Sequence, residues 1–253
     1  MNEYIKSLEQ EFSLIKSGFK EEEKRALDDY NSNDKEYVKR LAFLSYESKV
    51  YQVRMYGVFL SGYLSDDSDI LTFMRDEVSK DDNWRVQEVL AKAFDEYCKN
   101  KGYENAIPVI DEWLSSDNPN TRRAVTEGLR IWTSRPYFKE NPQEAIKRIA
   151  PLKEDASEYV RKSVGNVLRD ISRKFPELIK EELKTSMEDY KNKILQTLKT
   201  EFKIEGKGLH TGKNVTLVAK PASENFGIVF TRVDLPSSPQ IPALAEFVSN
   251  TDR

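Results

Sequence analysis

A chain of 253 residues with 38% hydrophobic and 33% charged residues is typical of a soluble protein with one large or two small domains. No apolar run approaches the roughly 20 residues that a membrane span needs, and the first residues lack a signal-peptide core. The single cysteine, Cys98, excludes an internal disulfide, and the single histidine, His210, argues against a zinc site, which needs three or four ligands. We therefore expect a cytoplasmic monomer without a membrane partner, bound metal or cofactor.

The net charge of −3 hides an asymmetry along the chain. Residues 121–174 hold thirteen Lys and Arg against seven Asp and Glu. A local basic face on an acidic protein is an electrostatic footprint for phosphate. The alternative is an ordinary solvated helix surface, which most charge runs are.

Apolar residues at helical spacing predict helices through most of the first 187 residues. The expected helices cover residues 3–17, 19–30, 35–47, 51–63, 68–79, 83–99, 103–115, 120–133, 142–152, 157–174 and 176–187. Gly18 is expected to end the first of them. Trp113, Trp132 and Cys98 are expected in the core.

Four of these helices resemble one another. The positions aligned by their apolar pattern are Arg54, Gln87, Arg123 and Lys162, with offsets of 33, 36 and 39 residues. The apolar positions six residues on are Leu60, Ala93, Leu129 and Leu168. A period in this range, with two helices per unit, predicts a mainly α protein, a HEAT-like α-α superhelical solenoid whose second helices line the concave side.

Trp84 and Glu88 lie one helical turn apart and therefore share a face. An indole beside a carboxylate can hold a flat, cationic substrate. In the alternative interpretation Trp84 is a core residue and Glu88 pairs with Lys92 at i+4.

Basic pairs stand at the start of two later helices, Arg122-Arg123 and Arg161-Lys162. If these helices line the same side as Trp84, the concave surface is basic. The alternative is that these side chains are ordinary surface charges.

The composition changes after about Ser186. We interpret residues 187–193 as a junction and residues 194–253 as a small β-rich C-terminal segment, with strands at 215–219 and 227–232 and a glycine-punctuated turn at 206–213. Sixty residues with two or three strands form a poor core alone.

Three motifs at 83–88, 116–124 and 160–170 closely resemble the DNA alkylation repair family, the AlkC/AlkD-like HEAT-repeat proteins, over residues 1–186. The resemblance implies a DNA glycosylase that removes cationic N3- and N7-alkylated purines from double-stranded DNA without a cofactor. Members of the AlkD type are understood to work without flipping the lesion, unlike other glycosylases.

The resemblance also assigns roles by position. Trp84 matches an aromatic residue packed against the deoxyribose of the lesion, and Glu88 matches an aspartate that faces the anomeric carbon. Arg123 matches an arginine on the DNA backbone, and Asn166 stands where AlkD has a second tryptophan. Bond cleavage builds oxocarbenium character, which a nearby carboxylate stabilises.

Four further contacts with DNA are expected beside Arg123. They come from Arg122, Arg161, Lys162 and Asn166.

Three motifs at 207–212, 217–222 and 227–235 strongly resemble the start of LpxC, the zinc-dependent UDP-3-O-acyl-N-acetylglucosamine deacetylase family. The family's zinc ligands and catalytic glutamate fall outside the matched stretch, and His210 matches a histidine that assists without binding metal. Two resemblances that adjoin at 186–194 indicate a fusion, a truncated gene model, or sequence joined across neighbouring genes. The candidate functions are therefore an alkylpurine glycosylase, a non-catalytic scaffold for DNA or protein, and an LpxC deacetylase fragment.

Overall fold

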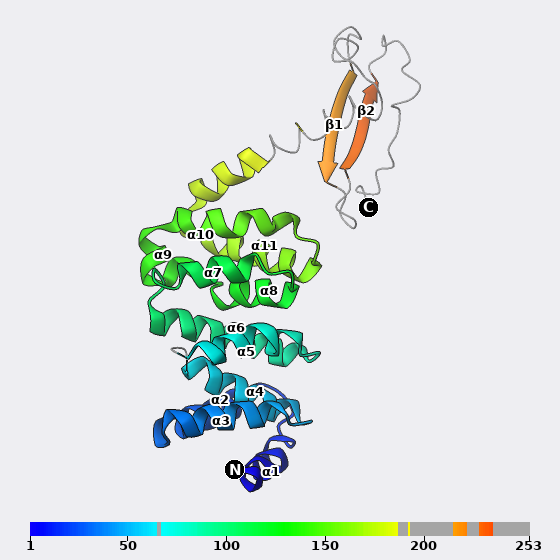
Figure 1. Ribbon diagram of the computed structural model, residues 1–253. Coiled ribbons are helices and arrows are strands. Elements are labelled where there is room, and N and C mark those ends of the chain that lie inside the picture. The colour runs from blue at the N-terminus through cyan, green and yellow to red at the C-terminus, as the bar shows by residue number, and fades with distance from the viewer. Residues whose placement is uncertain (65–66, 187–191, 193–214, 222–227, 235–253) are drawn as a thin grey trace. The chain divides into compact units, whose positions relative to one another are not determined.

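The computed structural model describes residues 1–64, 67–186, 192, 215–221 and 228–234 (Figure 1). The chain forms two compact units, residues 1–182 and 183–253. Each unit is described by itself below.

The described part of the first unit is helical, as predicted. Its α-helices are α1 (Asn2–Phe12), α2 (Lys20–Ser32), α3 (Lys35–Tyr46), α4 (Tyr51–Tyr63), α5 (Ser68–Asp76), α6 (Trp84–Lys101), α7 (Ile107–Leu114), α8 (Pro119–Gly128), α9 (Pro136–Glu140), α10 (Pro142–Ile149) and α11 (Glu158–Ser172). Short 3₁₀ turns are η1 (Val78–Lys80), η2 (Trp132–Ser134) and η3 (Ala150–Glu154), and residues 176–186 are helical as well. The first predicted helix was too long, because α1 ends at Phe12, and Gly18, with a φ of 88°, lies in the link before α2.

Polar side chains cap the N-termini of several of these helices. They accept hydrogen bonds from backbone N–H groups that have no partner inside the helix. Asn83 accepts a hydrogen bond from the N–H of Arg85, and Asn118 accepts one from the N–H of Asn120. The same type of cap therefore fixes where α6 and α8 start, and with it the direction of their first side chains.

The helices follow one another in a stack, in which α4, α6, α8 and α11 pack against each other in that order (Figure 1). Two glycines allow close approach within this row. A Cβ on Gly62 would lie 2.9 Å from the Cα of Ala93, and one on Gly128 would lie 2.2 Å from the carbonyl oxygen of Ala91. Both contacts are too short for any side chain, so α6 sits against its two neighbours at backbone distance.

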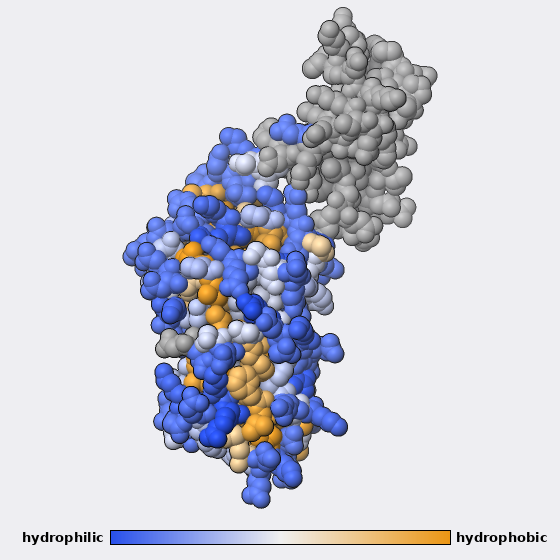
Figure 2. Space-filling model, in the orientation of Figure 1, coloured by the Kyte–Doolittle hydropathy of each residue, from blue (hydrophilic) through white to orange (hydrophobic). Residues whose placement is uncertain are grey.

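The core runs through the helical unit between these layers. Trp113, Trp132 and Cys98 are fully buried, as predicted. The ring centroids of Trp113 and Phe94 are 4.3 Å apart. Those of Trp132 and Phe138, a residue of α9, are 4.4 Å apart. Figure 2 shows hydrophilic residues over most of the visible surface of this unit, with apolar residues in a band that runs down the unit.

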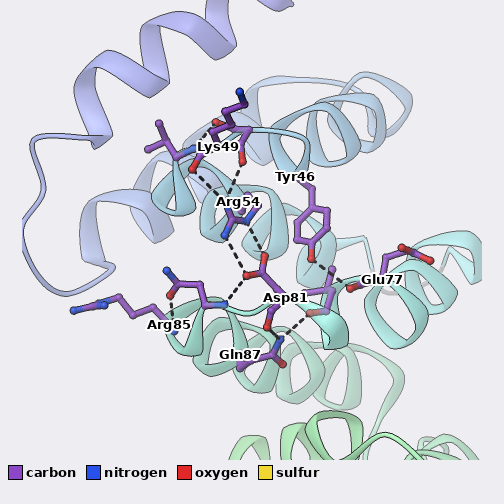
Figure 3. A network of polar contacts seen from close by, with 11 residues as sticks. Tyr46, Lys49, Arg54, Glu77, Asp81, Arg85 and Gln87 are labelled. Atoms are coloured by element: carbon purple, nitrogen blue, oxygen red, sulfur yellow. Dashed lines mark hydrogen bonds and ion pairs between the residues drawn. The ribbon is translucent and has the colours of Figure 1, made fainter.

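A recurring arginine network shows the true register of the repeats. Arg54 of α4 binds Asp81 through Nε and Nη2, at 2.7 and 3.1 Å, and donates from Nη1 to the carbonyl oxygen of Ser48 at 3.0 Å (Figure 3). Arg122 of α8 makes the same contacts two repeats later. It binds Asp155 at 2.6 and 2.7 Å and donates to the carbonyl oxygen of Ser116 at 2.6 Å.

Two other residues keep the backbone part of this network. Gln87 donates to the carbonyl oxygen of Asp81 at 2.8 Å, and Arg161 donates to that of Asp155. Each residue of the set binds the carbonyl six positions before it. The equivalent positions are Arg54, Gln87, Arg122 and Arg161, with separations of 33, 35 and 39 residues.

The predicted alignment of Arg123 and Lys162 with Arg54 was therefore wrong by one residue. Val53, Val86 and Val160 occupy the preceding, buried position in three of the helices. In α8 this position holds Thr121, which is also fully buried. In α8, therefore, a polar residue at a core position hid the apolar pattern on which the alignment depended.

In the second unit, β1 (Val215–Pro221) pairs antiparallel with β2 (Ile228–Asp234), so that Val215 lies opposite Asp234 and Pro221 opposite Ile228. β1 covers the stretch predicted as a strand at 215–219, and β2 covers most of the one predicted at 227–232; each ends two residues later than expected. The predicted turn at 206–213, with His210, lies outside the described residues, and so does nearly all of the junction.

Candidate functional site

The candidate residues lie in the first turns of α6, α8 and α11. Because Asn83 caps α6, Trp84 is the first residue of this helix, and its side chain is 62% exposed. The alternative that Trp84 belongs to the core is therefore wrong. Glu88 lies one turn further along α6 and is half-buried.

Glu88 and Arg123 form an ion pair between α6 and α8, through Glu88 Oε1 and Arg123 Nη2. The Glu88 side chain is 39% exposed and that of Arg123 is 17% exposed. The alternative of an i+4 pair with Lys92 is wrong, because the Lys92 ammonium binds Glu23 at 3.3 Å. The structure thus brings the carboxylate and the arginine of the predicted site into direct contact.

The corrected register explains why these residues share a face. Glu88, Arg123 and Lys162 each follow the network residue of their own repeat, so they are equivalent positions of consecutive repeats. We call the surface formed by Trp84, Glu88, Arg123 and Lys162 the Trp84 face.

An unexpected cation stands beside the indole. The guanidinium carbon of Arg85 lies 4.4 Å from the centroid of the Trp84 ring and 5.4 Å from that of the Tyr51 ring. Cation–π contacts of this kind hold exposed aromatic rings in place. The repeat could have identified Tyr51 as a residue equivalent to Trp84, because it precedes Trp84 by the same 33 residues that separate Arg54 from Gln87.

Arg122 does not point toward the Trp84 face. Its guanidinium binds Asp155 and the Ser116 carbonyl, and the side chains of Arg122 and Asp155 are only 13% and 5% exposed. Burial by itself raises the pKa of Asp155, but the hydrogen bonds from Arg122 and from the N–H of Ser157 outweigh it, and the net pKa is lowered. Arg161 donates to the carbonyls of Asp155 and Ala156 in the same loop.

Lys162 and Asn166 lie along α11. Lys162 is exposed and pairs with Glu158 at 2.6 Å, and the hydrogen bond with Glu158 raises the pKa of the Lys162 ammonium. Asn166 is half-buried one turn further on. Tyr159 is exposed in the first turn of α11 and was not among the predicted residues.

A buried polar link fastens α11 to α8 behind Arg123. The hydroxyl of Ser163 donates to Oγ1 of Thr126 at 2.6 Å, and Thr126 donates in turn to the carbonyl of Arg123 at 3.1 Å. This link fixes the backbone that carries Arg123. Its signal in the sequence was weak, since Ser and Thr at helical spacing are common on exposed faces as well.

Two searches bear on other classes of function. Within the described ranges, no three His, Cys, Asp or Glu side chains come close enough together to hold a metal ion. No helix in this part of the chain has the length and apolar character needed to cross a bilayer.

Two comparisons concern the helical part of the chain. A family model described as "DNA alkylation repair enzyme" matches residues 5–197. The crystal structure of AlkD2 from Streptococcus mutans superposes with a TM-score of 0.72 at 74% identity, covering 72% of this chain and 88% of that one. A second structure, of smu.31 from Streptococcus mutans UA159, gives a TM-score of 0.70 at 72% identity with the same coverage. The helical solenoid is thus shared with these structures.

The C-terminal part is similar to different proteins. The LpxC family model, "UDP-3-O-acyl N-acetylglycosamine deacetylase", matches residues 195–253. The deacetylase of Chlamydia caviae is 52% identical over 58 residues, which are 23% of this chain and 20% of that protein. The bifunctional enzyme LpxC/FabZ of Bacteroides thetaiotaomicron is 45% identical over 58 residues, 23% of this chain and 13% of that protein. The chain therefore spans only a small part of the curated relatives that it matches.

Proposed function

This chain belongs to the DNA alkylation repair enzyme family, and on that premise we propose that its helical unit binds double-stranded DNA through the Trp84 face and excises cationic N3- and N7-alkylated purines. The observation that carries the proposal is the exposed indole of Trp84 one turn from the carboxylate of Glu88, with a cation on the next repeat.

The chemistry follows from these two side chains. The Trp84 ring offers a flat, electron-rich surface to the sugar of the damaged nucleotide and to its positively charged base. The Glu88 carboxylate stabilises the oxocarbenium character that builds on the sugar as the N-glycosidic bond breaks, and it can orient the attacking water. Because the leaving base is already cationic, the reaction needs no general acid.

Arg123 connects DNA binding to this chemistry. In the free protein its guanidinium binds Glu88. A backbone phosphate offers the same guanidinium a bidentate partner. We infer that Arg123 turns from Glu88 to the phosphate on binding, which leaves the carboxylate free to face the sugar.

The other predicted DNA contacts divide into two kinds. Lys162 is exposed and can exchange Glu158 for a phosphate, and Asn166 lies one turn beyond it. Arg122 and Arg161 hold the loops at Ser116 and Asp155, so we propose that they act by positioning α8 and α11 rather than by direct contact.

A second candidate function is a non-catalytic scaffold that binds DNA or protein. Two observations favour it. Arg123 already neutralises the Glu88 carboxylate, and Asn166 offers no aromatic surface at the position where AlkD has a second tryptophan.

Release of 7-methylguanine from methylated duplex DNA separates the two candidates. We expect the purified chain to release the base, and the Glu88→Gln variant to bind the same duplex without releasing it. Binding without release by the wild-type chain would favour the scaffold. Absence of both binding and release would contradict the proposed function.

For the LpxC-like residues 195–253 we propose a catalytically incomplete fragment. The zinc chemistry of that family needs several ligands, and the chain contains one histidine and one cysteine. Zinc-dependent acetate release from the UDP-sugar substrate would contradict this proposal.

A further inference from the structure

A second basic region lies at the other ends of α8 and α11, away from Trp84. It is a cleft of about 560 Å³ within the helical unit. Its principal lining residues are Arg130, Ile131, Arg169, Asp170, Arg173 and Lys174. None of them contributes to the Trp84 face, and none was predicted as a site residue.

Three guanidinium groups converge here on one carboxylate. The side chain of Asp170, which is 12% exposed, binds Arg130 at 3.0 Å, Arg173 at 3.3 Å and Arg169 at 3.7 Å. Lys174 adds a fourth cation, and its ammonium donates to the hydroxyl of Ser134 at 2.6 Å.

The cleft therefore holds more positive than negative charge. Against these four cations the lining has Asp170 and Glu127, while Arg135 is paired with Asp95. This leaves two positive charges that no carboxylate of the lining neutralises. Like charges held this close repel one another, and a bound anion would relieve the repulsion.

The exposure of the groups favours a ligand from solvent. Asp170 lies at the base of the cluster, whereas Arg169 and Arg173 are exposed and reach into solvent. Planar guanidinium groups bind the oxygens of a phosphate in bidentate fashion. Ile131, a large apolar side chain, is exposed at the same cleft and can pack against a flat, apolar group.

We propose that this cleft is a phosphate-binding site, separate from the Trp84 face, that takes a phosphate ester carrying a base. Such a ligand can come from two sources, a free nucleotide or the backbone of a DNA strand. The proposal does not depend on glycosylase activity.

The competing explanation is structural. Cations near the C-terminal end of a helix interact favourably with its dipole, and Arg169 lies in the last turn of α11. That role requires no convergence of three arginines on one carboxylate and no cleft. It does, however, predict a loss of stability when the arginines are removed, without any change in ligand binding.

The test compares Arg169→Ala/Arg173→Ala with Lys80→Ala/Lys99→Ala. The control variant removes the same charge from exposed ion pairs elsewhere on the helical unit. Two probes are used in full-length protein. These are ADP, followed by calorimetry, and an undamaged DNA duplex, followed by fluorescence anisotropy over a range of salt concentrations.

If the ligand is a free nucleotide, we expect the arginine variant to bind ADP at least roughly tenfold more weakly than the control does. If it is a DNA strand, we expect the salt slope for the duplex to fall by about two units in the arginine variant compared with the control. Equal binding by both variants with both probes would overturn the proposal and leave the dipole explanation.

Two further variants address a possible folding defect of the alanine variant and separate this proposal from the proposed glycosylase activity. Should the alanine variant fail to fold, Arg169→Lys/Arg173→Lys keeps the charge but not the fork geometry, and it should still weaken ADP or duplex binding. A lysine variant that binds both probes like the wild type would also overturn the proposal. Glu88→Gln, which lies on the Trp84 face, should leave ADP binding in the cleft unchanged. Failure of the glycosylase proposal would show separately, as lack of excision by the wild-type chain.

Discussion

Arg122 and Arg123 are adjacent residues of the same type, and each forms an ion pair with a carboxylate of another repeat. The pair between Arg122 and Asp155 is nearly buried and has further bonds to backbone. The pair between Arg123 and Glu88 lies on the Trp84 face, with a carboxylate that is 39% exposed. The pair between Arg122 and Asp155 stabilises the packing of two repeats, whereas the pair between Arg123 and Glu88 is accessible to a ligand.

The difference arises from burial and from the number of bonds at each pair. A charge taken out of water needs full compensation, and Asp155 receives it from Arg122 and from the N–H of Ser157. Arg123 is nearly as buried as Arg122, but its partner Glu88 is 39% exposed, whereas Asp155 is 5% exposed. A pair with a water-exposed carboxylate contributes less to stability, so exchanging Glu88 for a phosphate costs less. Two identical side chains thus serve different purposes within one turn of helix.

The largest difference between the two ion pairs should appear when each arginine is replaced by alanine, and Arg122→Ala should have the larger effect on stability. The change leaves Asp155 buried without its cation, and we expect a loss of about 3–5 kcal/mol in the free energy of unfolding. Arg123→Ala is the matched control and should cost about 1 kcal/mol or less. Urea unfolding of both variants measures the difference, and equal losses would show that the two pairs are not distinct.

Glu88→Gln tests the exposed pair from the carboxylate side. The variant removes the negative charge that stabilises the transition state, and we expect excision to fall roughly 10²–10³-fold. DNA affinity should stay the same or rise slightly, because a negative charge near phosphate is lost. Glu96→Gln on the same helix is the control. Excision by Glu88→Gln at the wild-type rate would remove Glu88 from catalysis.

A third carboxylate extends the comparison to a buried acid without a cation. Glu22 of α2 is fully buried, and neither of its oxygens accepts a hydrogen bond of normal geometry from the described residues. Burial raises the pKa of Glu22 to about 7, and its own backbone N–H offsets only part of the rise. Asp155, in contrast, has a lowered pKa because its hydrogen bonds outweigh its burial.

These opposite shifts have opposite effects on stability. The folded chain keeps the Glu22 proton up to about pH 7 whereas the unfolded chain releases it near its usual pKa of 4.5, so stability falls as pH rises between these values. We expect Glu22→Gln to remove about 3 kcal/mol of this loss. Urea unfolding measures the free energy of unfolding of both proteins at pH 5 and pH 8. The variant should be more stable relative to the wild type at pH 8 than at pH 5. A difference that does not depend on pH would contradict the assignment to Glu22.

The sequence predicted the helices and the core well, because both depend on local spacing. Trp113, Trp132 and Cys98 are buried as expected. The short helix α9 was missed, and the repeat register failed at Thr121, where a polar residue fills a core position.

The roles of the charged residues were harder to predict, because their partners are distant in sequence. Arg122 and Arg123 look alike until Asp155, 33 residues away, and Glu88, 35 residues away, are in place. Sequence spacing offered Lys92 as an alternative partner of Glu88, but the neighbouring helix supplied Arg123 instead. Ion pairing between repeats is a tertiary choice that helical periodicity does not contain.

The smallest expected effect concerns Arg123 in DNA binding. A single phosphate contact contributes about one unit to the slope of log affinity against log salt, so Arg123→Ala should flatten this slope by roughly one unit on alkylated and undamaged duplexes alike. Lys101→Ala, an exposed lysine at the end of α6, is the control and should leave the slope unchanged. Arg123 can make this contact only by leaving Glu88, so in Glu88→Gln its contribution should persist and the affinity should be equal or higher. An unchanged slope in Arg123→Ala would mean that the arginine stays with Glu88 when DNA binds, and that the exposed pair is as structural as the buried one.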